Sequence, residues 1–454
     1  MRKVMLFCSL LFCLTWPVQA LPEINAMAPL IVRERSEFQH QLKVAKKLGI
    51  TAISVDVWWG LVEQAGDQQF VWQYYDDVFS DIRAAGLKII PIMAFHQCGG
   101  NVGDDCDIPL PGWIWTHYQR KGIAPDDLRY QSEDGNTANE TLSLWSDELV
   151  KTQYIEFMQA FATRYQTIAT DFVELNISMG PAGELRYPSY NSHDGVAAAF
   201  PSRGRFQAYS LLSRTDFQHW LEQRYQSIAT LNSGWGTAYQ NFAEIALPMS
   251  WDQAIASNQH LTEPSRQDFL QWYHQALVAH GARMLRYAEY AFQQLPAEIP
   301  LGFKIPGIHW TINSDIGART AELAAGIIDA NAAFSSTPEP GYQQIIALAA
   351  PKAKQQRKVV VHFTALEMSD EPEGEAGSMP STLVNWIGAE ARRQGVILKG
   401  ENALAAGLYH AEGWSNLQQV LRNGNYQGLT LLRLNDIVEN PLAVATLQQL
   451  QPGF

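Results

Sequence analysis

Short apolar runs rich in β-branched residues recur along this chain, and each is followed by polar residues and then by a helical pattern. The eight runs are Ala26–Val32, Thr51–Val57, Leu87–Phe95, Phe172–Met179, Ile299–Ile305, Lys358–Phe363, Gly395–Leu398 and Gly428–Leu434. The clearest helical patterns between them cover residues 282–295 and 321–328. Strands that alternate with helices form parallel βαβ units. Eight such units predict the α/β class and a closed (β/α)8 barrel, the TIM-barrel fold.

The intervals between these runs are uneven, with long stretches after the third and the fourth. Residues 96–150 and 184–267 fill these stretches and are rich in Gly, Pro, Trp and Tyr. A barrel accommodates such excess in the loops that leave the carboxyl ends of its strands, where barrel enzymes build their active sites. We therefore predict long functional loops after strands 3 and 4, not linkers between domains.

The first twenty residues have the composition of a secretory signal peptide. Arg2 and Lys3 precede an apolar run from Val4 to Trp16, and the segment ends on the small residue Ala20. A membrane anchor is the weaker alternative, because the run is shorter than the about 20 residues that span a bilayer. We expect a secreted or periplasmic protein that leaves the membrane after cleavage, with residues 21–454 forming one catalytic domain.

The charge balance narrows the class of ligand. The chain carries 33 Lys and Arg against 46 Asp and Glu, a formal net charge of −13, and the predicted leader contains two of the basic residues. A field of this sign repels nucleic acids and anionic membranes. Neutral or cationic ligands remain open. A neutral sugar also suits the 14 tryptophans and 17 tyrosines, which offer flat faces on which sugar rings stack.

Two cysteines remain once the predicted leader, with Cys8 and Cys13, is removed. Cys98 and Cys106 lie eight residues apart, and an exported protein favours a disulfide between them. Zinc ligation with His96 is the alternative, but two cysteines and one histidine without a second cluster make a poor zinc site.

Polar residues stand at or just beyond the ends of the predicted strands and therefore converge on one rim of the barrel. They are Asp56, His96, Glu184, Lys304, His309, Thr364, Glu401 and Arg433. Two glutamates on one rim, without a serine elbow, a phosphate loop or a metal-ligand cluster, indicate acid–base chemistry on a glycosidic bond. One carboxyl group must then be protonated and the other ionised, and the neighbouring charges separate their pKa values.

Six segments around these residues resemble the signature blocks of the β-amylases, in the order of that family. They are Val55–Glu63, Phe95–Asp104, Gly180–Tyr190, Gly307–Trp310, Phe363–Met368 and Gly400–Leu404. The resemblance implies an exo-acting, inverting α-1,4-glucan maltohydrolase that needs no cofactor for its chemistry. It makes Glu184 the general acid and Glu401 the general base that activates water. It also implies that residues 99–104 form a mobile flap over the substrate.

The resemblance further implies which side chains bind glucose units. These are Asp56, His96, Asp104, Lys304, His309, Thr364, Asn402, Ala403 and Arg433. Starch, amylose or maltodextrin is the expected substrate. The chain ends soon after Arg433, so we expect no appended starch-binding domain and a monomer that acts on soluble glucans.

Bacterial β-amylases similar to this chain also bind a structural calcium ion. Their ligand pattern falls here on Glu63, Asp67, Gln68 and Glu156, oxygen donors of the kind that calcium prefers. A further acidic ligand is replaced by Gln153, which still offers a carbonyl oxygen. Solvated loop carboxylates are the alternative interpretation.

Two other functions remain open from sequence. One is a barrel glycosidase that acts on another glucan or cleaves chains internally. The other is a non-catalytic glucan sensor on the same fold, against which the presence of Glu184, Glu401, Asp56, Thr364 and Arg433 argues.

Overall fold

The computed structural model describes residues 23–101, 103–312, 319–330, 341–353 and 356–450. The predicted signal peptide lies outside the described residues. Eight parallel strands close into a barrel in the order β1-β10-β9-β8-β7-β6-β3-β2, which confirms the predicted fold. The strands are β1 Glu23–Met27, β2 Ala52–Trp58, β3 Lys88–Ala94, β6 Leu175–Ile177, β7 Leu301–Ile305, β8 Val359–Phe363, β9 Ile397–Glu401 and β10 Gly428–Leu431.

Every predicted run contains or overlaps a strand, but several of the predicted bounds are wrong. The first strand ends at Met27 and not at Val32, because Pro29 has no N–H with which to continue the ladder. The strand predicted to begin at Gly395 begins at Ile397. Gly395 instead has φ 69° and ends the preceding helix, a conformation that glycine adopts without strain.

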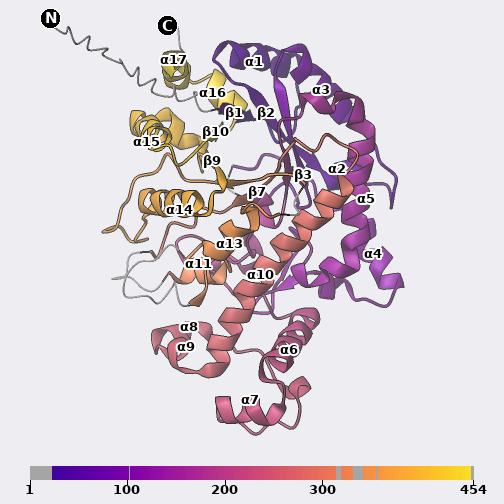
Figure 1. Cartoon of the computed structure of the whole chain (residues 1–454), viewed down its shortest axis with the longest axis vertical. Helices are drawn as coiled ribbons and strands as arrows, with labels where there is room; N and C mark the ends of the chain where they lie inside the picture. Colours follow the sequence, from indigo (N-terminus) through magenta and orange to yellow (C-terminus); the bar gives the residue numbers. More distant parts are fainter. Residues whose placement is uncertain (1–22, 102, 313–318, 331–340, 354–355, 451–454) are drawn as a thin grey trace, which may run out of the picture.

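Helices pack around the barrel (Figure 1). The longer ones are α1 Arg35–Lys47, α3 Gln73–Ala84, α5 Asp147–Tyr165, α10 Pro264–Ala291, α14 Pro380–Gln394, α15 Ala411–Arg422 and α17 Pro441–Leu450. The pattern at 282–295 belongs to the much longer α10, whereas the helix predicted at 321–328 is only the five-residue α11, Thr320–Ala324. Gly326, with φ 74°, follows it and interrupts the helical path.

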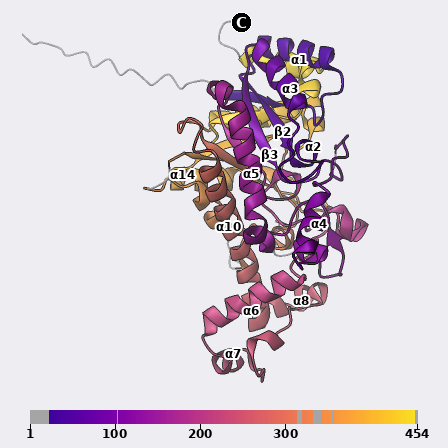
Figure 2. The ribbon, with the colours of Figure 1, turned by 90° about the vertical axis from the view of Figure 1, so that its right-hand side faces the viewer.

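The two long insertions follow strands 3 and 4 of the barrel, as predicted. The first, after β3, contains α4 Trp113–Arg120 and a small hairpin of β4 Tyr130–Gln131 with β5 Thr137–Ala138. The second, after β6, contains α6 Leu211–Tyr225, α7 Ile228–Trp235, α8 Trp251–Ala256 and α9 Gln259–Thr262. Figures 1 and 2 show these last four helices as a lobe that projects away from the barrel beside one end of α10.

Polar residues inside the barrel constrain their neighbours. Gly302 on β7 is paired with Asn176 on β6. A Cβ atom at position 302 would overlap the side-chain oxygens of Asn176 and Glu174. A residue larger than glycine is therefore excluded at 302 unless these buried polar groups move.

Two further features complete the fold. Cys98 and Cys106 form the expected disulfide, with their Cα atoms 5.6 Å apart, so neither sulfur is free and the zinc alternative is wrong. None of the helices in the described part of the chain is long and apolar enough to cross a bilayer.

Candidate active site

Glu184 and Glu401 reach the same end of the barrel from different strands. Glu401 is the last residue of β9. Glu184 follows β6 through the turn Gly180–Glu184 and forms a β-bridge with Lys304 on β7. The site is thus built at the carboxyl ends of the strands, as the sequence predicted.

The Glu401 carboxylate is buried among cations. The Nζ atom of Lys304 donates a hydrogen bond to its Oε2 atom at 2.9 Å, and Nδ1 of His362 lies 3.4 Å from Oε1. Burial alone would raise the pKa of this group, but Lys304 and His362 outweigh it and lower the pKa to about 2. Glu401 is therefore ionised at neutral pH, the state that a general base requires.

The Glu184 carboxyl group has the opposite tendency. Burial raises its pKa above the ordinary value, and the nearby Glu401 acts in the same direction. Arg186 and Lys304 oppose this shift, and Nε of Arg186 donates to Oε2 of Glu184 at 2.8 Å. The pKa values of the two glutamates are thus shifted in opposite directions. Glu184 is shifted toward the protonated acid form and Glu401 toward the ionised base form.

Asp56 extends this cluster of charges. It lies on β2, and burial raises the pKa of its carboxyl group although Arg433 and Lys304 lower it. The charges of Glu401 and Asp104 also act on it. The structure therefore brings five of the predicted residues into one electrostatic neighbourhood: Asp56, Asp104, Lys304, Glu401 and Arg433.

The two histidines predicted to contact sugar are held neutral. Nδ1 of His96 is 2.7 Å from Oγ of Ser178, and burial with the charge of Lys304 lowers its pKa to about 3. Nδ1 of His309 is 2.6 Å from Oγ of Ser378, and burial lowers its pKa to about 4. Neutral imidazoles with one ring nitrogen fixed suit hydrogen bonds to sugar hydroxyls.

Asn402 and Ala403 directly follow β9 and Glu401. The amide of Asn402 is fully buried and bonds to backbone groups of Leu404 and Leu432. The N–H of Ala403 donates to the carboxylate of Glu367 at 3.0 Å. The Asn402 side chain thus ties the ends of β9 and β10 together.

Thr364 and Asp104 lie on loops whose shape depends on glycine. Thr364 directly follows β8, and a Cβ atom at Gly307 would lie 2.6 Å from its Oγ1 atom. Asp104 joins the two ends of the predicted flap segment, since its Oδ2 atom accepts hydrogen bonds from the backbone N–H groups of Gly99 and Asn101 at 3.1 Å. Residue 102 of the flap lies outside the described residues.

The sequence model of glycosyl hydrolase family 14 matches residues 20–451. The chain belongs to glycosyl hydrolase family 14. The resemblance to β-amylases found in the six sequence blocks is thereby confirmed.

Relatives of this family 14 chain cover nearly all of it. A β-amylase of Bacillus cereus is 36% identical over 425 residues, which are 93% of this chain and 71% of that protein. A thermophilic β-amylase of Thermoanaerobacterium thermosulfurigenes is also 36% identical, over 93% of this chain and 72% of that protein. The crystal structure of the catalytic domain of the Paenibacillus polymyxa β-amylase superposes with a TM-score of 0.82 at 33% identity, covering 94% and 97% of the two chains.

The predicted flap segment of this family 14 chain is followed by an exposed ion pair. Arg33, in the loop after β1, forms an ion pair with Asp105 at 2.6 Å. A cavity of about 610 Å³ lies here, lined by Arg33, Gly103, Asp105 and Arg433 among others. The Cys98–Cys106 disulfide links the two ends of the predicted flap segment.

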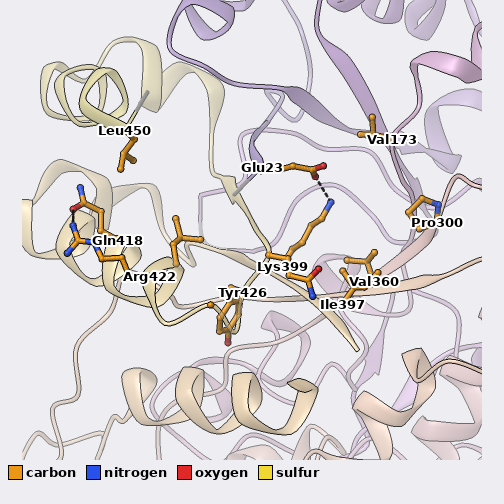
Figure 3. A pocket seen from close by; sticks show the side chains of 13 residues that line it. Glu23, Val173, Pro300, Val360, Ile397, Lys399, Gln418, Arg422, Tyr426 and Leu450 are labelled. Atoms are coloured by element: carbon orange, nitrogen blue, oxygen red, sulfur yellow. Dashed lines mark hydrogen bonds and ion pairs between the residues drawn. The ribbon is translucent and has the colours of Figure 1, made fainter. Parts of the chain in front are cut away.

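A second cavity, of about 800 Å³, lies at the opposite end of the barrel (Figure 3). Its lining includes Glu23, Val360 and Ile397, which stand at or near the amino ends of their strands. This end of a barrel serves stability and not catalysis. We therefore assign no part of the glucan site to this cavity.

The predicted calcium ligands form one cluster. Glu63 is buried, and its two oxygens accept N–H groups of Trp59 at 2.6 Å and Gln68 at 2.5 Å. Burial raises the pKa of Glu63 to about 7, and the charges of Asp67 and Glu156 act in the same direction. The side chain of Gln68 interacts with Glu156, so the structure brings together the three carboxyl groups and the amide that the sequence singled out.

The fit of this cluster to a metal ion is incomplete. Oδ1 of Asp67 is buried without a hydrogen-bond partner, as a free cation ligand would be. The side-chain oxygen of Gln153 already contacts the hydroxyl of Tyr118. Among the residues that the structure describes, no group of three or more His, Cys, Asp or Glu side chains has the arrangement of a metal site. A calcium ion here would need backbone or water oxygens in addition.

Sequence reasoning missed several residues of the site. Arg186 binds Glu184, and Glu367 holds the backbone after Asn402. His362 and Glu174 lie behind Glu401. A signal existed for the last two, because charged residues within the predicted buried runs 172–179 and 358–363 must find partners inside the barrel.

Proposed function

We propose that this chain is an exo-acting, inverting hydrolase of α-1,4-glucosidic bonds that releases β-maltose from the non-reducing ends of starch or maltodextrin. Membership of glycosyl hydrolase family 14 and the β-amylases among its relatives support the substrate and the reaction. The observation that supports the chemistry is the opposite direction of the pKa shifts of Glu184 and Glu401, which share one end of the barrel.

In this proposal Glu184 is the general acid and Glu401 the general base. Glu184 gives its proton to the leaving glycosidic oxygen, and Glu401 takes a proton from a water molecule that attacks the anomeric carbon from the opposite face. Water attack opposite to the leaving group converts an α linkage into a β product. Asp56, His96, Asp104, Lys304, His309, Thr364 and Arg433 are proposed to bind the glucose units, with Asn402 and Ala403 contributing through the backbone.

The test is ¹H NMR of the product during digestion of amylose. β-Maltose as the first and only product supports the exo-acting, inverting reaction. α-Maltose, or a mixture of longer oligosaccharides with a rapid loss of viscosity, would contradict it. A chain that binds amylose and releases nothing would be the non-catalytic sensor.

We also propose that Glu63, Asp67, Gln68 and Glu156 hold a structural calcium ion. The unpaired buried Oδ1 of Asp67 and the oxygen-only donor set support this proposal. The ion would carry no step of the hydrolysis; it would neutralise three neighbouring carboxyl groups and stabilise the loop after α2 (Trp59–Val62).

Removal of calcium is expected to lower the melting temperature by several degrees, because a ligand that binds only the folded state stabilises it. The measurement is differential scanning calorimetry with EGTA, followed by calcium or magnesium. Calcium alone should restore stability. Asp67→Asn should abolish the EGTA effect, whereas Asp77→Asn, at an exposed ion pair with Arg35, should preserve it. An unchanged melting temperature with EGTA would contradict the proposed calcium site.

We further propose that the chain is exported, with residues 1–20 as its signal peptide. The Cys98–Cys106 disulfide supports an oxidising compartment. Mass spectrometry of the mature amino terminus tests the cleavage, which is expected after Ala20.

A further inference from the structure

A buried row of charges runs through the barrel interior behind the candidate base. Lys304 on β7, His362 on β8 and Lys399 on β9 are register neighbours on three adjacent strands. Three basic side chains side by side in a protein interior are tolerable only if anions separate them. Glu174 and Glu401 provide the anions.

The five side chains alternate in sign, and we call them the ionic column. Lys399 is 3.0 Å from Oε2 of Glu174, and the other oxygen of Glu174 contacts Nε2 of His362. Nδ1 of His362 is 3.4 Å from Oε1 of Glu401, whose Oε2 is 2.9 Å from Lys304. All five are at most 8% exposed, so solvent does not screen these contacts.

The ring of His362 therefore faces a carboxylate at each nitrogen. Only an imidazolium has N–H groups at both positions, whereas a neutral ring would place a lone pair against one of the carboxylates. Nδ1 makes no hydrogen bond of good geometry within the described residues, so its contact with Glu401 is a charge interaction at 3.4 Å. Burial disfavours the charge, but Glu174 and Glu401 raise the pKa of His362 above its ordinary value.

We propose that His362 is a charged positioning residue, held as an imidazolium by Glu174, which keeps the general base Glu401 ionised and fixed in the ionic column. Lys399 completes the column and bonds to Glu23 at 3.0 Å, beside the cavity at the far end of the barrel (Figure 3). This inference rests on the proposed role of Glu401.

The charged groups around Glu401 show how the effect of His362 differs from that of Lys304. Glu401 contacts Lys304 and His362, and it interacts electrostatically with Glu184 and Asp56. Lys304 acts on both candidate catalytic glutamates, whereas the charges that shift Glu184 are those of Arg186, Lys304 and Glu401. Loss of the His362 charge should therefore affect the base and leave the acid unchanged.

His362→Gln tests this assignment through the pH profile of kcat/KM on maltodextrin. Without the imidazolium the pKa of Glu401 rises, so the acid limb should move to higher pH by about 1 unit, as expected for one opposite charge removed from contact. The alkaline limb and the KM at the optimum should stay close to those of the wild type. His280→Gln is the matched control, because His280 is also a buried histidine that pairs with a carboxylate, Asp147, at 2.7 Å. It should lower the melting temperature and leave both limbs in place.

A folded His362→Gln protein with an unmoved acid limb would overturn the proposal. If this variant does not fold, ¹⁵N NMR of the histidine rings in the wild type gives an independent answer. His362–Phe363 is the only His–Phe pair in the chain, so pairwise labelling assigns it without a substitution. His362 should remain mostly doubly protonated at pH 6.5, where an ordinary histidine is half neutral, and a mainly neutral ring at that pH would refute the inference.

The NMR result does not depend on catalysis. A wild-type protein that releases no maltose would contradict the proposed function and leave the imidazolium assignment standing. A neutral His362 in an enzyme that releases β-maltose would refute the imidazolium assignment and leave the proposed function standing.

Discussion

Glu401→Gln is expected to reduce maltose release from amylose by a factor of about 10²–10⁴ or more, the contribution of a positioned acid or base. Glutamine keeps the size of the side chain and its contact with Lys304 on one oxygen, but it cannot accept a proton from water. Glu184→Gln should cause a loss of similar size, because the leaving oxygen then departs without a proton. Initial rates of reducing-sugar release measure both effects.

The two variants should differ on an activated substrate. The fluoride of α-maltosyl fluoride leaves with little help from an acid, so Glu184→Gln should recover much of its rate on this compound. Glu401→Gln should not, because water still needs a base. Glu390→Gln is the matched control, since Glu390 is buried and ion-paired to Arg393 on α14, and its activity should stay close to that of the wild type. Recovery by Glu401→Gln alone would reverse the assigned roles.

Lys304→Met should produce the second-largest effect and move the whole pH profile. Lys304 lowers the pKa of both Glu401 and Glu184, so its loss raises both. The base then needs a higher pH to ionise, and the acid keeps its proton to a higher pH. Both limbs of the bell-shaped profile should therefore move upward.

The rate at the optimum should also fall, because Lys304 no longer positions the Glu401 carboxylate. The free energy of unfolding should fall by about 3–5 kcal/mol, the cost of leaving one partner of a buried ion pair alone. The pH dependence of kcat/KM and of kcat separates the shift of the limbs from the fall in rate. Lys304→Arg retains the positive charge, so both limbs of its pH profile should stay at the wild-type pH values even if its rate falls. A Lys304→Met profile with unchanged limbs would show that Lys304 does not control the two carboxyl groups.

The barrel could be predicted from sequence because parallel strands are buried on both faces and appear as continuous apolar runs. The limits of these runs were less reliable. Phe172–Met179 is apolar enough for eight residues of strand, but only Leu175–Ile177 is β6. Phe172 instead forms a single bridge with Ile89. Which part of an apolar run pairs depends on its neighbours in the closed barrel, and these are remote in sequence.

The same dependence on contacts between remote segments explains which site residues could be predicted from the sequence. Glu184 and Glu401 end predicted strands and lie in family blocks, so position and resemblance both pointed to them. Glu174 and His362 are 188 residues apart and interact only after the barrel closes. The sequence showed that each is a polar residue in a buried run, but not that the two are partners. The role of Asn402 was also hidden, because its contact with Leu432 joins two separate strands.

Gly302 shows how this interior restricts the mutational freedom of the chain. The residue carries no side chain and is not expected to meet the glucan, yet a Cβ atom there would displace Glu174 and Asn176. Displacing Glu174 would release His362, and through it the base. In a saturation library sorted by activity, position 302 should therefore tolerate as few replacements as the two glutamates. The positions that such a library marks as essential for activity would therefore extend down the barrel, well below the surface that the substrate contacts.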